Sequence, residues 1–505
     1  MPSVMKTLLL NPPSFENFDG GAGSRWPVSR EIESYWYPVW LTYPAGMLEG
    51  SHLVDASPHR ITQQMCVEMA RDYEFLVVFT STVWFDVDCN LIRRMKALNP
   101  DLKVCFVGPH VQNEPVKSLN ACAELDFVVR GEFDHAVVEF AQGWPLEKIR
   151  GISYRKNGHV AHTEPRQQLH TEELDALPFA TDVYRRDLKI ENYNVPFLLH
   201  PYVSLYTTRG CPALCTFCQW PQTISGHAWR VRSVDNVVRE VRQALEYWPQ
   251  LKEFFWDDDT FNIRKDRVIA LCEGFKPLKF RWSCNARVHS DYETLKAMAE
   301  GGARLFIVGF ESGDDQILKN IKKGATVAMA REFVKNCKKV GITIHGDFII
   351  GLPGETKQTI EKKIDFAKEL DCETVQVSMA HAFPGTELYN YAASNGFLRT
   401  EALTDSLGHQ LPHIEYPNLS REDMMAGVRR FYDSYYFRPR IIWRIVRKAL
   451  WDSNERKRLI AEGMDFLRTR REWKQKVKKG IDTPKPAMVA VPAAVDHSSG
   501  SAASD

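Results

Sequence analysis

Short apolar runs alternate with helical patterns along most of this chain, and this alternation limits the fold more than any other feature of the sequence. In the first third of the chain, strands are predicted at Thr7–Leu10, Leu53–Val54, Phe75–Phe79, Val104–Val107 and Phe127–Val129. Helical patterns separate them at Ile61–Ala70, Asp88–Leu98 and Phe133–Ala141. Strands that are buried on both faces and joined through helices form parallel sheets. We therefore predict an α/β fold that starts with a doubly wound parallel sheet, whose ligand crevice lies beyond the carboxyl ends of the strands.

A second alternation starts near Tyr202. It predicts six more strands, at Val203–Tyr206, Phe254–Trp256, Phe280–Ser283, Leu305–Val308, Thr343–Ile350 and Thr374–Val377. Helical patterns separate these strands at Val234–Trp248, Tyr292–Glu300, Ala328–Val340 and Lys357–Leu370. Six strand–helix units indicate a partial (β/α)6 barrel, and by analogy with complete barrels its chemistry is expected at the carboxyl ends of the strands.

The segments outside these two alternations differ in composition. A hairpin signal around Asn157–Gly158 is followed by an acidic stretch that contains proline. After about Thr400 the pattern is helical and rich in arginine and aromatic residues, and the last segment is rich in proline, alanine and serine, which is typical of disorder. The predicted organisation is a sheet domain over residues 1–155, a connector over 156–195, a barrel over 196–400, a helical region over 401–480 and a disordered tail over 481–505.

The charge balance and the cysteine count narrow the class of protein. Lysine and arginine total 65 against 64 aspartate and glutamate, so the formal net charge of +1 gives no overall attraction to nucleic acid. No apolar run reaches the ~18 to 20 residues that span a bilayer, and the N-terminus lacks a signal-peptide core. Eleven cysteines, an odd number spread over a long chain, suit a reducing compartment. We expect a cytoplasmic protein that binds no nucleic acid.

One segment, Thr207–Cys218, concentrates the metal-binding potential of the chain. It places Cys211, Cys215 and Cys218 within eight residues, directly after a predicted strand. Structural zinc usually takes four ligands, often from two CxxC pairs, and the sequence offers no second pair. Three thiolates can instead bind three corners of a four-iron cubane and leave its fourth iron open to a substrate ligand. We predict such a cluster here, with a zinc knuckle or buried structural cysteines as the alternative.

This CxxxCxxC motif on the loop after the first barrel strand, with the aromatic Phe217 before its last cysteine, resembles the hallmark of the radical S-adenosylmethionine (SAM) superfamily. The resemblance covers about residues 201–396. It implies that the open iron chelates the amino and carboxylate groups of SAM. It also implies that an electron from the [4Fe-4S] cluster cleaves SAM to a 5'-deoxyadenosyl radical, so a low-potential donor such as flavodoxin or ferredoxin is an expected partner.

The same resemblance assigns SAM contacts near the ends of the barrel strands. These predicted contacts are Phe217, Asp257, Arg287, Glu311, Ser312 and Gly351. Asp257 is expected near the methionine end of SAM, Arg287 at its carboxylate, Glu311 at the ribose and Gly351 beside the adenine, where a glycine allows close approach. Plainer interpretations stay open: a solvated turn or a calcium loop for the three adjacent carboxylates that start at Asp257, and a structural ion pair for Arg287.

Motifs at the strand ends of the first domain resemble the cobalamin-binding domain that precedes the barrel in the largest radical SAM subgroup. The predicted cobalamin contacts, all on the crevice side of the sheet, are Asn11, Gly108, His110, Gly131 and Glu132. The DxHxxG motif that supplies a histidine ligand to cobalt is absent, because Asp55 and His59 have the wrong spacing. Cobalamin is therefore predicted to bind without a protein imidazole, and a domain that has lost the cofactor is the alternative.

Beyond the subgroup, segments 11–15, 19–25 and 35–38 resemble the bacteriohopanetetrol cyclitol ether synthase family of hopanoid biosynthesis. The resemblance implies a ring contraction that converts the glucosamine of an amphiphilic hopanoid glycolipid, bacteriohopanetetrol glucosamine, into a cyclitol ether. His345 and His381, near strand ends, are candidate proton donors, with a core histidine as the alternative. Two other functions stay open: cobalamin-dependent methylation of an unactivated carbon, and a non-catalytic iron–sulfur redox sensor.

Two further segments bear on how a substrate is reached and enclosed. The aromatic run Tyr35–Trp40 and the loop Gly20–Gly23 are expected to cover the radical site, or to pack as ordinary segments. The segment Arg438–Trp451 has an apolar stripe flanked by arginine and lysine, which suits a helix that lies on the inner face of an anionic membrane. A helix packed on the barrel with snorkelling basic side chains is the alternative.

Overall fold

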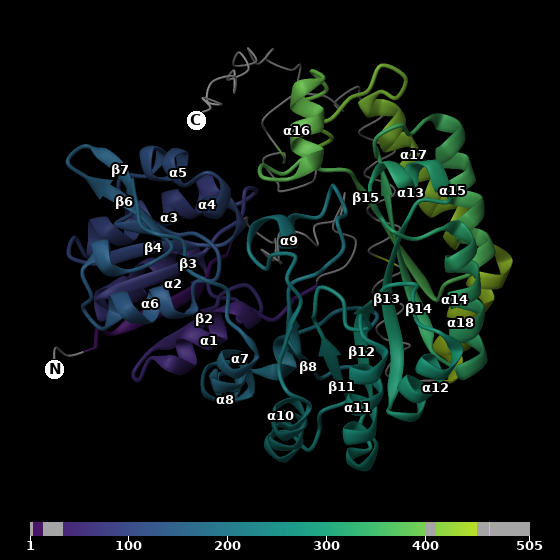
Figure 1. Ribbon diagram of the computed structural model, residues 1–505, viewed down its shortest axis with the longest axis horizontal. Helices are drawn as coiled ribbons and strands as arrows, with labels where there is room; N and C mark the ends of the chain where they lie inside the picture. Colours follow the sequence, from purple (N-terminus) through teal and green to yellow (C-terminus); the bar gives the residue numbers. More distant parts are fainter. Residues whose placement is uncertain (1–3, 14–33, 400–402, 404–410, 452–463, 465–505) are drawn as a thin grey trace, which may run out of the picture.

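The computed structural model describes residues 4–13, 34–399, 403, 411–451 and 464, and Figure 1 shows its two α/β units side by side. The predicted fold class is confirmed, since a mostly parallel sheet domain is followed by six parallel barrel strands and a helical C-terminal segment. Residues 14–25, which carry part of the hopanoid-family resemblance and include the loop Gly20–Gly23, lie outside the described residues. The predicted tail over 481–505 lies outside them too.

The first sheet has seven strands in the order β2-β1-β3-β4-β5-β6-β7. Its strands are β1 (Thr7–Asn11), β2 (His52–Asp55), β3 (Phe75–Phe79), β4 (Lys103–Val107), β5 (Phe127–Val129), β6 (Ile152–Lys156) and β7 (His159–His162). The five predicted strands are β1 to β5, and they pair in parallel. The hairpin β6–β7 adds two antiparallel strands, so the sheet extends past the boundary predicted at residue 155.

Helices cover both faces of this sheet because its side chains alternate in direction along each strand. Leu8 and Leu10 are buried in a core with α2, α3 and α5, whereas Leu9 belongs to a second core with α1 and α6. The helices of this domain are α1 (Val39–Met47), α2 (Gln63–Met69), α3 (Phe85–Leu98), α4 (Pro109–Asn113), α5 (Pro115–Ala121) and α6 (Asp134–Ala141). The connector contributes α7 (Thr171–Ala176) and α8 (Ala180–Asp187).

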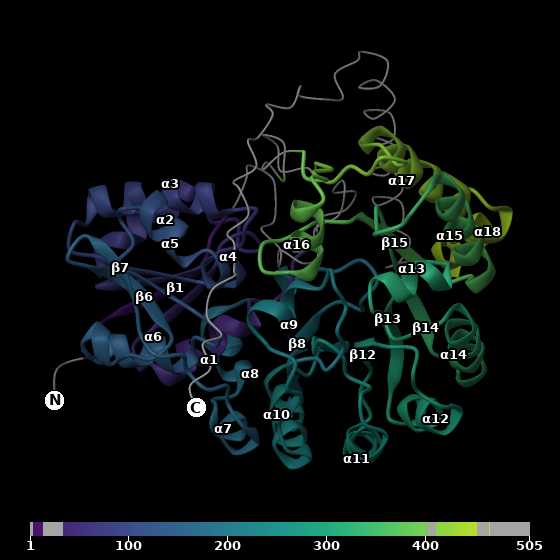
Figure 2. The ribbon, with the colours of Figure 1, turned by 45° about the horizontal axis from the view of Figure 1, so that its top comes forward.

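The barrel sheet follows the chain from one edge to the other, in the order β15-β14-β13-β12-β11-β8. Its six strands are β8 (Tyr202–Leu205), β11 (Glu253–Trp256), β12 (Trp282–Ala286), β13 (Ala303–Glu311), β14 (Thr343–Ile350) and β15 (Thr374–Met379). A two-stranded ribbon of β9 (Thr208–Arg209) and β10 (Arg230–Val231) flanks the loop that bears the cysteines. β8 and β15 do not pair, so the barrel stays open on the side of the first domain (Figure 2).

The helices of the barrel domain are α9 (Gln219–Thr223), α10 (Val234–Tyr247), α11 (Lys265–Phe275), α12 (Tyr292–Glu300), α13 (Asp315–Asn320), α14 (Val327–Val340), α15 (Lys357–Leu370) and α16 (Glu387–Ser394). α10, α11, α12, α14 and α15 lie outside the strands, whereas α9 lies between the sheet and the first domain (Figure 1). α12 and α15 match their predicted bounds because each starts at a side-chain cap, Asp291 and Thr356 respectively. β12 begins two residues later than predicted, because Phe280 lies outside the strand and packs its ring against Phe254 and Phe275.

Two C-terminal helices, α17 (Arg421–Tyr436) and α18 (Pro439–Trp451), complete the described chain. α17 protects the open edge of β15: the backbone N–H of Val377 donates to the Tyr432 hydroxyl at 3.0 Å, and the Tyr436 hydroxyl donates to the Val375 carbonyl at 3.0 Å. Among the described residues, every helix is too short or too polar to cross a bilayer.

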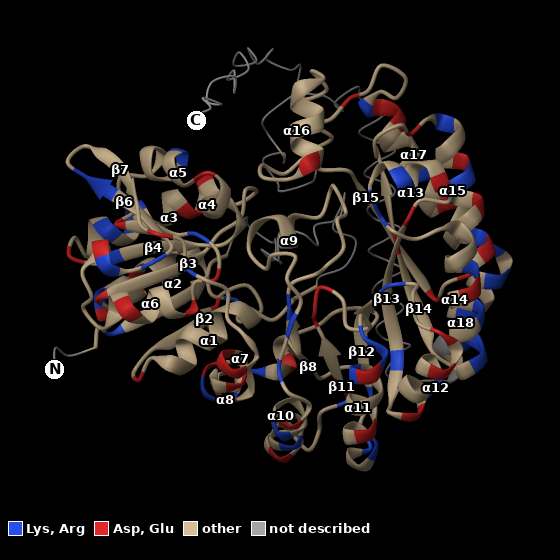
Figure 3. Ribbon diagram, viewed as in Figure 1, with Lys and Arg blue, Asp and Glu red and all other residues tan. Residues whose placement is uncertain are grey.

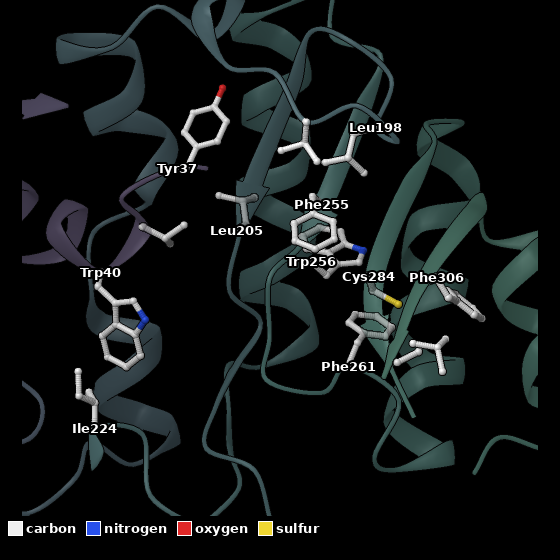
Figure 4. Close-up of a cluster of buried hydrophobic side chains, with 14 of the residues drawn as sticks. Tyr37, Trp40, Leu198, Leu205, Ile224, Phe255, Trp256, Phe261, Cys284 and Phe306 are labelled. Carbon is white, nitrogen blue, oxygen red and sulfur yellow. The ribbon is translucent and has the colours of Figure 1, made fainter. Parts of the chain in front are cut away.

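The aromatic run Tyr35–Trp40 lies between the two domains, and Figure 4 shows Tyr37 and Trp40 in one cluster with barrel residues such as Leu205 and Phe255. The Tyr37 ring stacks on Tyr193 with 3.7 Å between ring centroids, and its hydroxyl donates to the Tyr202 carbonyl at 2.8 Å. The run therefore forms part of the core that holds the domains together.

Candidate functional site

The cysteine loop follows β8 and is held in shape by hydrogen bonds from its surroundings. The carboxylate of Asp258 accepts from the backbone N–H groups of Thr207 and Thr208, at 2.6 and 2.8 Å. At the other end of the loop, the Gln222 side-chain amide donates to the carbonyls of Cys215 and Cys218, at 3.1 and 2.7 Å. The path of the loop is therefore fixed by protein contacts alone, which pre-organises its three thiols.

Gly210, directly before Cys211, allows the loop to approach the neighbouring chain closely. Its φ of +88° lies in the left-handed region, and a Cβ there would stand 2.2 Å from the Ala228 carbonyl oxygen. Cys211 then donates its backbone N–H to the Gly226 carbonyl at 3.2 Å. Only glycine fits this position, because any side chain would push Cys211 away from the segment 226–228.

A cavity of about 300 Å³ lies where the two domains meet, and all three cysteines line it. The first domain contributes Asn11, at the end of β1, and Phe79, at the end of β3. The segment Trp36–Leu41 forms a third side. The size is typical of a cofactor or small-molecule site, and its walls come from both domains. A ligand in the cavity would therefore contact the cysteine loop and the sheet domain together.

The groups around the three thiols are compatible with an iron–sulfur cluster. A guanidinium nitrogen of Arg287 donates to Cys215 Sγ at 3.6 Å, and the Thr260 hydroxyl lies 3.6 Å from Cys211 Sγ. Burial, followed by the nearby Cys215, raises the pKa of the Cys218 thiol well above its ordinary value. Positive iron would reverse this effect, because a coordinated thiol is deprotonated. Three soft ligands on a fixed loop, next to a cation that can balance sulfide charge, fit an iron–sulfur cluster.

No three His, Cys, Asp or Glu side chains among the described residues lie close enough together to hold a single metal ion. The fit to an iron–sulfur cluster therefore depends on the fixed path of the cysteine loop and on the hydrogen bonds around its thiols. A site that is already shaped for a single metal ion is not required.

The structure brings four of the six predicted SAM contacts into this cavity. Phe217, Asp257, Arg287 and Glu311 line it together with the cysteines. Ser312 is fully buried next to Glu311, and its hydroxyl accepts the backbone N–H of Asp314 at 3.3 Å. Ser312 and Gly351 are not among the residues that line the cavity. All six assignments stay predictions.

Gly351 has a structural role in the loop after β14. Its φ is +93°, its backbone N–H donates to Glu355 at 2.6 Å, and its carbonyl accepts the Tyr416 hydroxyl at 2.9 Å. The predicted approach to adenine would place a ligand beside a turn that is already fully hydrogen-bonded.

Glu311 owes its position to an irregularity in β13. The pairing of β13 with β14 shifts between Gly309 and Glu311, and Glu311 itself has a φ of +63°, which is strained for a residue with a side chain. Its carboxylate accepts from Lys323 Nζ at 2.8 Å, and both side chains are buried. Burial lowers the pKa of Lys323, but the charges of Glu311 and Cys215 outweigh it, so the pKa is raised overall. The Lys323 ammonium therefore remains charged beside the cavity.

We expect Gly309→Ala to weaken SAM binding. A Cβ at Gly309 would stand 2.2 Å from Glu311 Oε1, so the carboxylate would have to leave its place. Charged hydrogen bonds are worth about 1.5–3 kcal/mol, which corresponds to a roughly 10- to 100-fold higher Kd. Equilibrium dialysis of the reconstituted protein with SAM measures this change. Gly427→Ala in α17 is the control, and an unchanged Kd for Gly309→Ala would contradict the ribose assignment of Glu311.

The three adjacent carboxylates after β11 have different roles. Asp257 lines the cavity, and the Asn285 amide points to it at 3.4 Å. Asp258 is fully buried and anchors the cysteine loop; burial raises its pKa to about 6, although hydrogen bonds from Thr207 and Thr208 oppose the rise. Asp259 lines the cavity and accepts the Ser225 hydroxyl at 2.8 Å. The carboxylates therefore form part of the site and of its scaffold.

The predicted cobalamin contacts lie at the crevice edge of the first sheet, but only Asn11 also lines the central cavity. Gly108 follows β4 with a φ of +114°, and a Cβ there would stand 2.2 Å from the Thr80 carbonyl oxygen. The half-buried His110 ring lies 4.3 Å from the Phe85 ring, and burial lowers its pKa to about 4, so its imidazole is neutral.

Several buried polar atoms in this crevice lack a hydrogen-bond partner among the described residues, which bears on whether cobalamin fits here. Ser81 Oγ, His110 Nδ1 and Gln112 Oε1 are buried atoms that find no hydrogen-bond partner within the part of the chain that the structure describes. Buried polar atoms are normally paired, so three orphaned atoms near the ends of β3 and β4 indicate that a ligand supplies their partners. A large ligand with amide and phosphate groups, such as cobalamin, fits this crevice.

Glu132 and Gly131 lie on the side of the crevice that faces the barrel. Glu132 is buried, and its carboxylate pairs with Arg230 at 2.7 Å and with Arg209 at 3.6 Å. Arg209 in turn binds Asp134 through two nitrogens, at 2.8 and 3.0 Å. Glu132 therefore ties the sheet domain to the cysteine loop, whereas Gly131 has a φ of +81° with open space at its Cβ position.

The two histidines that were candidate proton donors are not in the cavity wall. His345 stacks on Phe197 and places Nδ1 2.6 Å from the Thr374 hydroxyl and Nε2 3.2 Å from Asp347. Asp347 lines the cavity and His345 contacts Asp347, so His345 is separated from the cavity by that side chain. His381 packs against His413, and burial lowers its pKa to about 4. Their catalytic roles stay predictions.

Sequence reasoning missed several cavity residues, of which Lys323 and Asp347 are the most prominent. Asp347 had a signal, because polar His345 and Asp347 alternate with apolar residues and so share the inner face of β14. Lys323 had none, since it lies in the loop after α13 and no motif marks it. Trp40 lies in the aromatic run that the sequence already marked as a cover.

Two family models match the chain in the order of its two domains. A B12 binding domain matches residues 25–141, and the radical SAM superfamily matches residues 205–367. The two matches meet at the cavity described above, since each contributes part of its wall.

Three curated relatives extend the similarity over most of the chain. An uncharacterized methyltransferase of Pyrococcus horikoshii is 32% identical over 87% of this chain and 94% of its own length. A cytidylyl-2-hydroxyethylphosphonate methyltransferase of Streptomyces wedmorensis is 31% identical over 65% of this chain and 68% of its own length. An anaerobic magnesium-protoporphyrin IX monomethyl ester cyclase of Cereibacter sphaeroides is 24% identical over 82% of this chain and 70% of its own length.

Two solved structures share the fold. The cobalamin-dependent SAM radical enzyme OxsB, with aqua-cobalamin and SAM bound, covers 95% of this chain and 82% of its own at 14% identity, with a TM-score of 0.64. The radical SAM methyltransferase TsrM of Kitasatospora setae, with tryptophan and a SAM analogue bound, covers 77% and 76% at 17% identity, with a TM-score of 0.61. At these identities the similarity establishes the arrangement of the domains alone.

Proposed function

The chain belongs to the radical SAM superfamily, in the group whose members carry a B12-binding domain before the barrel, and on this premise we propose that it methylates an unactivated carbon of its substrate. The [4Fe-4S] cluster, SAM and cobalamin are the cofactors of this group, as predicted. Two of the relatives named above are methyltransferases, and one of them is similar over nearly its whole length. This supports methyl transfer over the ring contraction that the hopanoid resemblance implied.

The main support for this proposal is the cavity that the two domains share. A methyl transfer at an unactivated carbon needs a radical source and a methyl carrier on either side of one substrate position. The wall from the barrel holds the cysteine loop, Asp257, Arg287 and Glu311, and the wall from the sheet domain holds Asn11 and Phe79. A substrate between these walls would face both cofactors.

When bound, the cluster supplies the electron that cleaves SAM to the 5'-deoxyadenosyl radical, and cobalamin carries the methyl group. Arg287 and Lys323 would bind and orient the carboxylate of SAM, because they are the cations that line the cavity. Trp36, Trp40 and Phe79 exclude water and offer few weakly bound hydrogens to a radical. Asp347, on the inner face of β14, is available to accept a hydrogen bond from a substrate hydroxyl or ammonium.

The overall reaction balances as follows. A substrate C–H bond and two molecules of SAM, with two electrons from a low-potential donor, give the methylated carbon, S-adenosylhomocysteine, methionine and 5'-deoxyadenosine. Flavodoxin or ferredoxin is the donor that we propose. Each turnover therefore forms equal amounts of 5'-deoxyadenosine and S-adenosylhomocysteine, which distinguishes methyl transfer from a reaction that uses SAM only as a radical source.

Ring contraction is the second candidate. One relative of this chain is named as a cyclase, and segment 35–38 carries part of the hopanoid-family resemblance. The substrate would be the glucosamine headgroup of bacteriohopanetetrol glucosamine, isomerised to a cyclitol ether. Its amino and hydroxyl groups match the carboxylates that line the cavity.

One incubation separates the two candidates. Anaerobically reconstituted protein is given cobalamin, reductant, bacteriohopanetetrol glucosamine and SAM with a deuterated methyl group, and products are analysed by chromatography and mass spectrometry. Methyl transfer predicts a product that has gained the labelled methyl, together with S-adenosylhomocysteine. A product of unchanged mass and new retention time would favour ring contraction. If both products are missing while 5'-deoxyadenosine forms, the enzyme is active and this lipid is not its substrate.

A further inference from the structure

Helix α18 presents a stripe of large apolar side chains to solvent. Ile442, Trp443, Val446 and Leu450 are exposed by 45%, 60%, 41% and 64%. Their spacing of one, three and four residues places them on one face of the helix. Single exposed apolar residues are common, but four together on one face indicate an interaction surface.

The opposite face of α18 fixes the helix on the barrel, so the stripe has to face outward. Ile441 is buried at 1% exposure, and Arg444 donates to the Cys372 carbonyl at 2.9 Å and to both oxygens of Asp371, at 3.0 and 2.9 Å. Both ribbon views show α18 at the outer edge of the molecule, on the far side of the barrel from the first domain (Figures 1 and 2). The stripe is therefore far from the cavity.

Basic side chains surround the stripe in excess of their acidic partners. Arg438, Arg440 and Arg444 converge on Asp371, at 3.5, 3.0 and 2.9 Å, and Arg444 also lies 3.6 Å from Glu373, so three cations share two carboxylates. Arg447 is exposed, and the helix sequence contains no acidic residue. Figure 3 shows the resulting band of basic residues on α18. Since the whole chain has a net charge of only +1, this edge is a local concentration of positive charge.

The same edge includes the C-terminal half of α14. Lys335, Lys338 and Lys339 line a groove whose other charged residues, Arg331 and Glu369, pair with each other. Leu370 also lines the groove, and its carbonyl accepts from Lys338 at 2.7 Å. Leu370 directly precedes Asp371, which holds the three arginines of the C-terminal segment. The lysines of α14 thus extend the cationic zone from the apolar stripe onto the barrel.

We propose that α18 docks the protein on an anionic lipid surface, with the stripe Ile442–Leu450 among the acyl chains and the arginines and lysines at the headgroups. An exposed apolar face bordered by cations is typical of helices that lie in a membrane interface. A second copy of the chain fits less well, because pairing this face with itself would bring two cationic zones together. Docking here is independent of the reaction in the cavity.

Binding of the full-length reconstituted protein to vesicles tests this surface. We expect cosedimentation with phosphatidylcholine vesicles that contain phosphatidylglycerol, and little with phosphatidylcholine alone. The double variant Trp443→Gln/Leu450→Gln should lose at least about tenfold in affinity, since it removes the most exposed apolar area of the stripe. Arg447→Gln should lose about fivefold, the contribution of one basic residue near an anionic surface, and the loss should shrink at high salt.

Two controls keep the test specific. Trp144→Gln changes a tryptophan that is 46% exposed on the first domain, and Lys276→Gln changes an exposed cation on the barrel outside the zone. Both should bind vesicles like the unchanged protein, and all variants should keep their rate of 5'-deoxyadenosine formation. The proposal is overturned if the protein stays unbound with both vesicle types or if Trp144→Gln weakens binding as much as the double variant. It is also overturned if light scattering shows a dimer that the double variant disrupts.

Discussion

Cys215→Ala should abolish the reductive cleavage of SAM. Each of the three thiols would hold one iron, and Cys215 is also the thiol that Arg287 contacts at 3.6 Å, so its loss removes a ligand and a charge contact together. A cubane with two protein ligands does not keep an iron open for SAM in a fixed position. We expect 5'-deoxyadenosine formation to fall below about 0.1% of the unchanged protein, on the scale of losses seen when a catalytic unit is broken. Iron and sulfide content should fall with it.

Cys272→Ala is the matched control for this substitution. Cys272 is buried in α11 at 3% exposure. Cys272→Ala therefore makes the same side-chain change as Cys215→Ala, but in the core and away from the cysteine loop. It should cost a little stability and leave the cluster content and the cleavage rate unchanged. Cleavage retained by Cys215→Ala, or lost equally by Cys272→Ala, would contradict the assignment of the cluster ligands.

Arg209→Met should destabilise the joined domains more than any surface substitution. Arg209 has 2% side-chain exposure, binds Asp134 through two nitrogens and lies 4.4 Å from the centre of the Trp40 ring. Burial lowers its pKa, but Asp134 and Glu132 outweigh burial and raise it, so the guanidinium is charged. Removing it leaves Asp134 buried without a cation, which typically costs about 3–5 kcal/mol. Denaturant unfolding followed by fluorescence measures the loss.

The control for this variant is an ion pair of the same geometry on the surface. Arg331 binds Glu369 through two nitrogens, at 2.6 and 2.9 Å, but both side chains are about half exposed, at 52% and 50%. Arg331→Met should cost at most about 1 kcal/mol, because water replaces the lost contact. Equal losses in the two variants would show that the buried pair between the domains is not a main source of their stability. Since Arg209 is two residues from Cys211, the variant should also lower cluster content.

The fold was predictable because its main signals are local. Short apolar runs in the sequence predicted every parallel strand of the two sheets. A side-chain cap marked the start of α12 and of α15. The hairpin at Asn157–Gly158 was also visible, but the sequence does not say which strand β6 pairs with. Its pairing with β5, which extends the first sheet, depends on packing between distant segments.

The candidate site was predictable only where its residues belong to a contiguous motif. The cysteines, Asp257, Arg287 and Glu311 were assigned from short segments and lie around one cavity. Lys323 was missed because its partner Glu311 is brought to it by a shift in strand pairing, which no local pattern signals. The pairing of the predicted cobalamin contact Glu132 with Arg230 was not foreseen either, because these residues are 98 positions apart and are brought together by the packing of the two domains.

We infer that three cysteines hold a cluster whose open iron binds SAM inside the cavity between the domains. Electron paramagnetic resonance of the anaerobically reconstituted and reduced protein, recorded before and after addition of SAM, tests it most directly. We expect the signal of a reduced [4Fe-4S] cluster that changes when SAM is added, with 5'-deoxyadenosine formed on warming. A protein that contains zinc in place of iron, or a cluster whose signal is unaffected by saturating SAM, would contradict it.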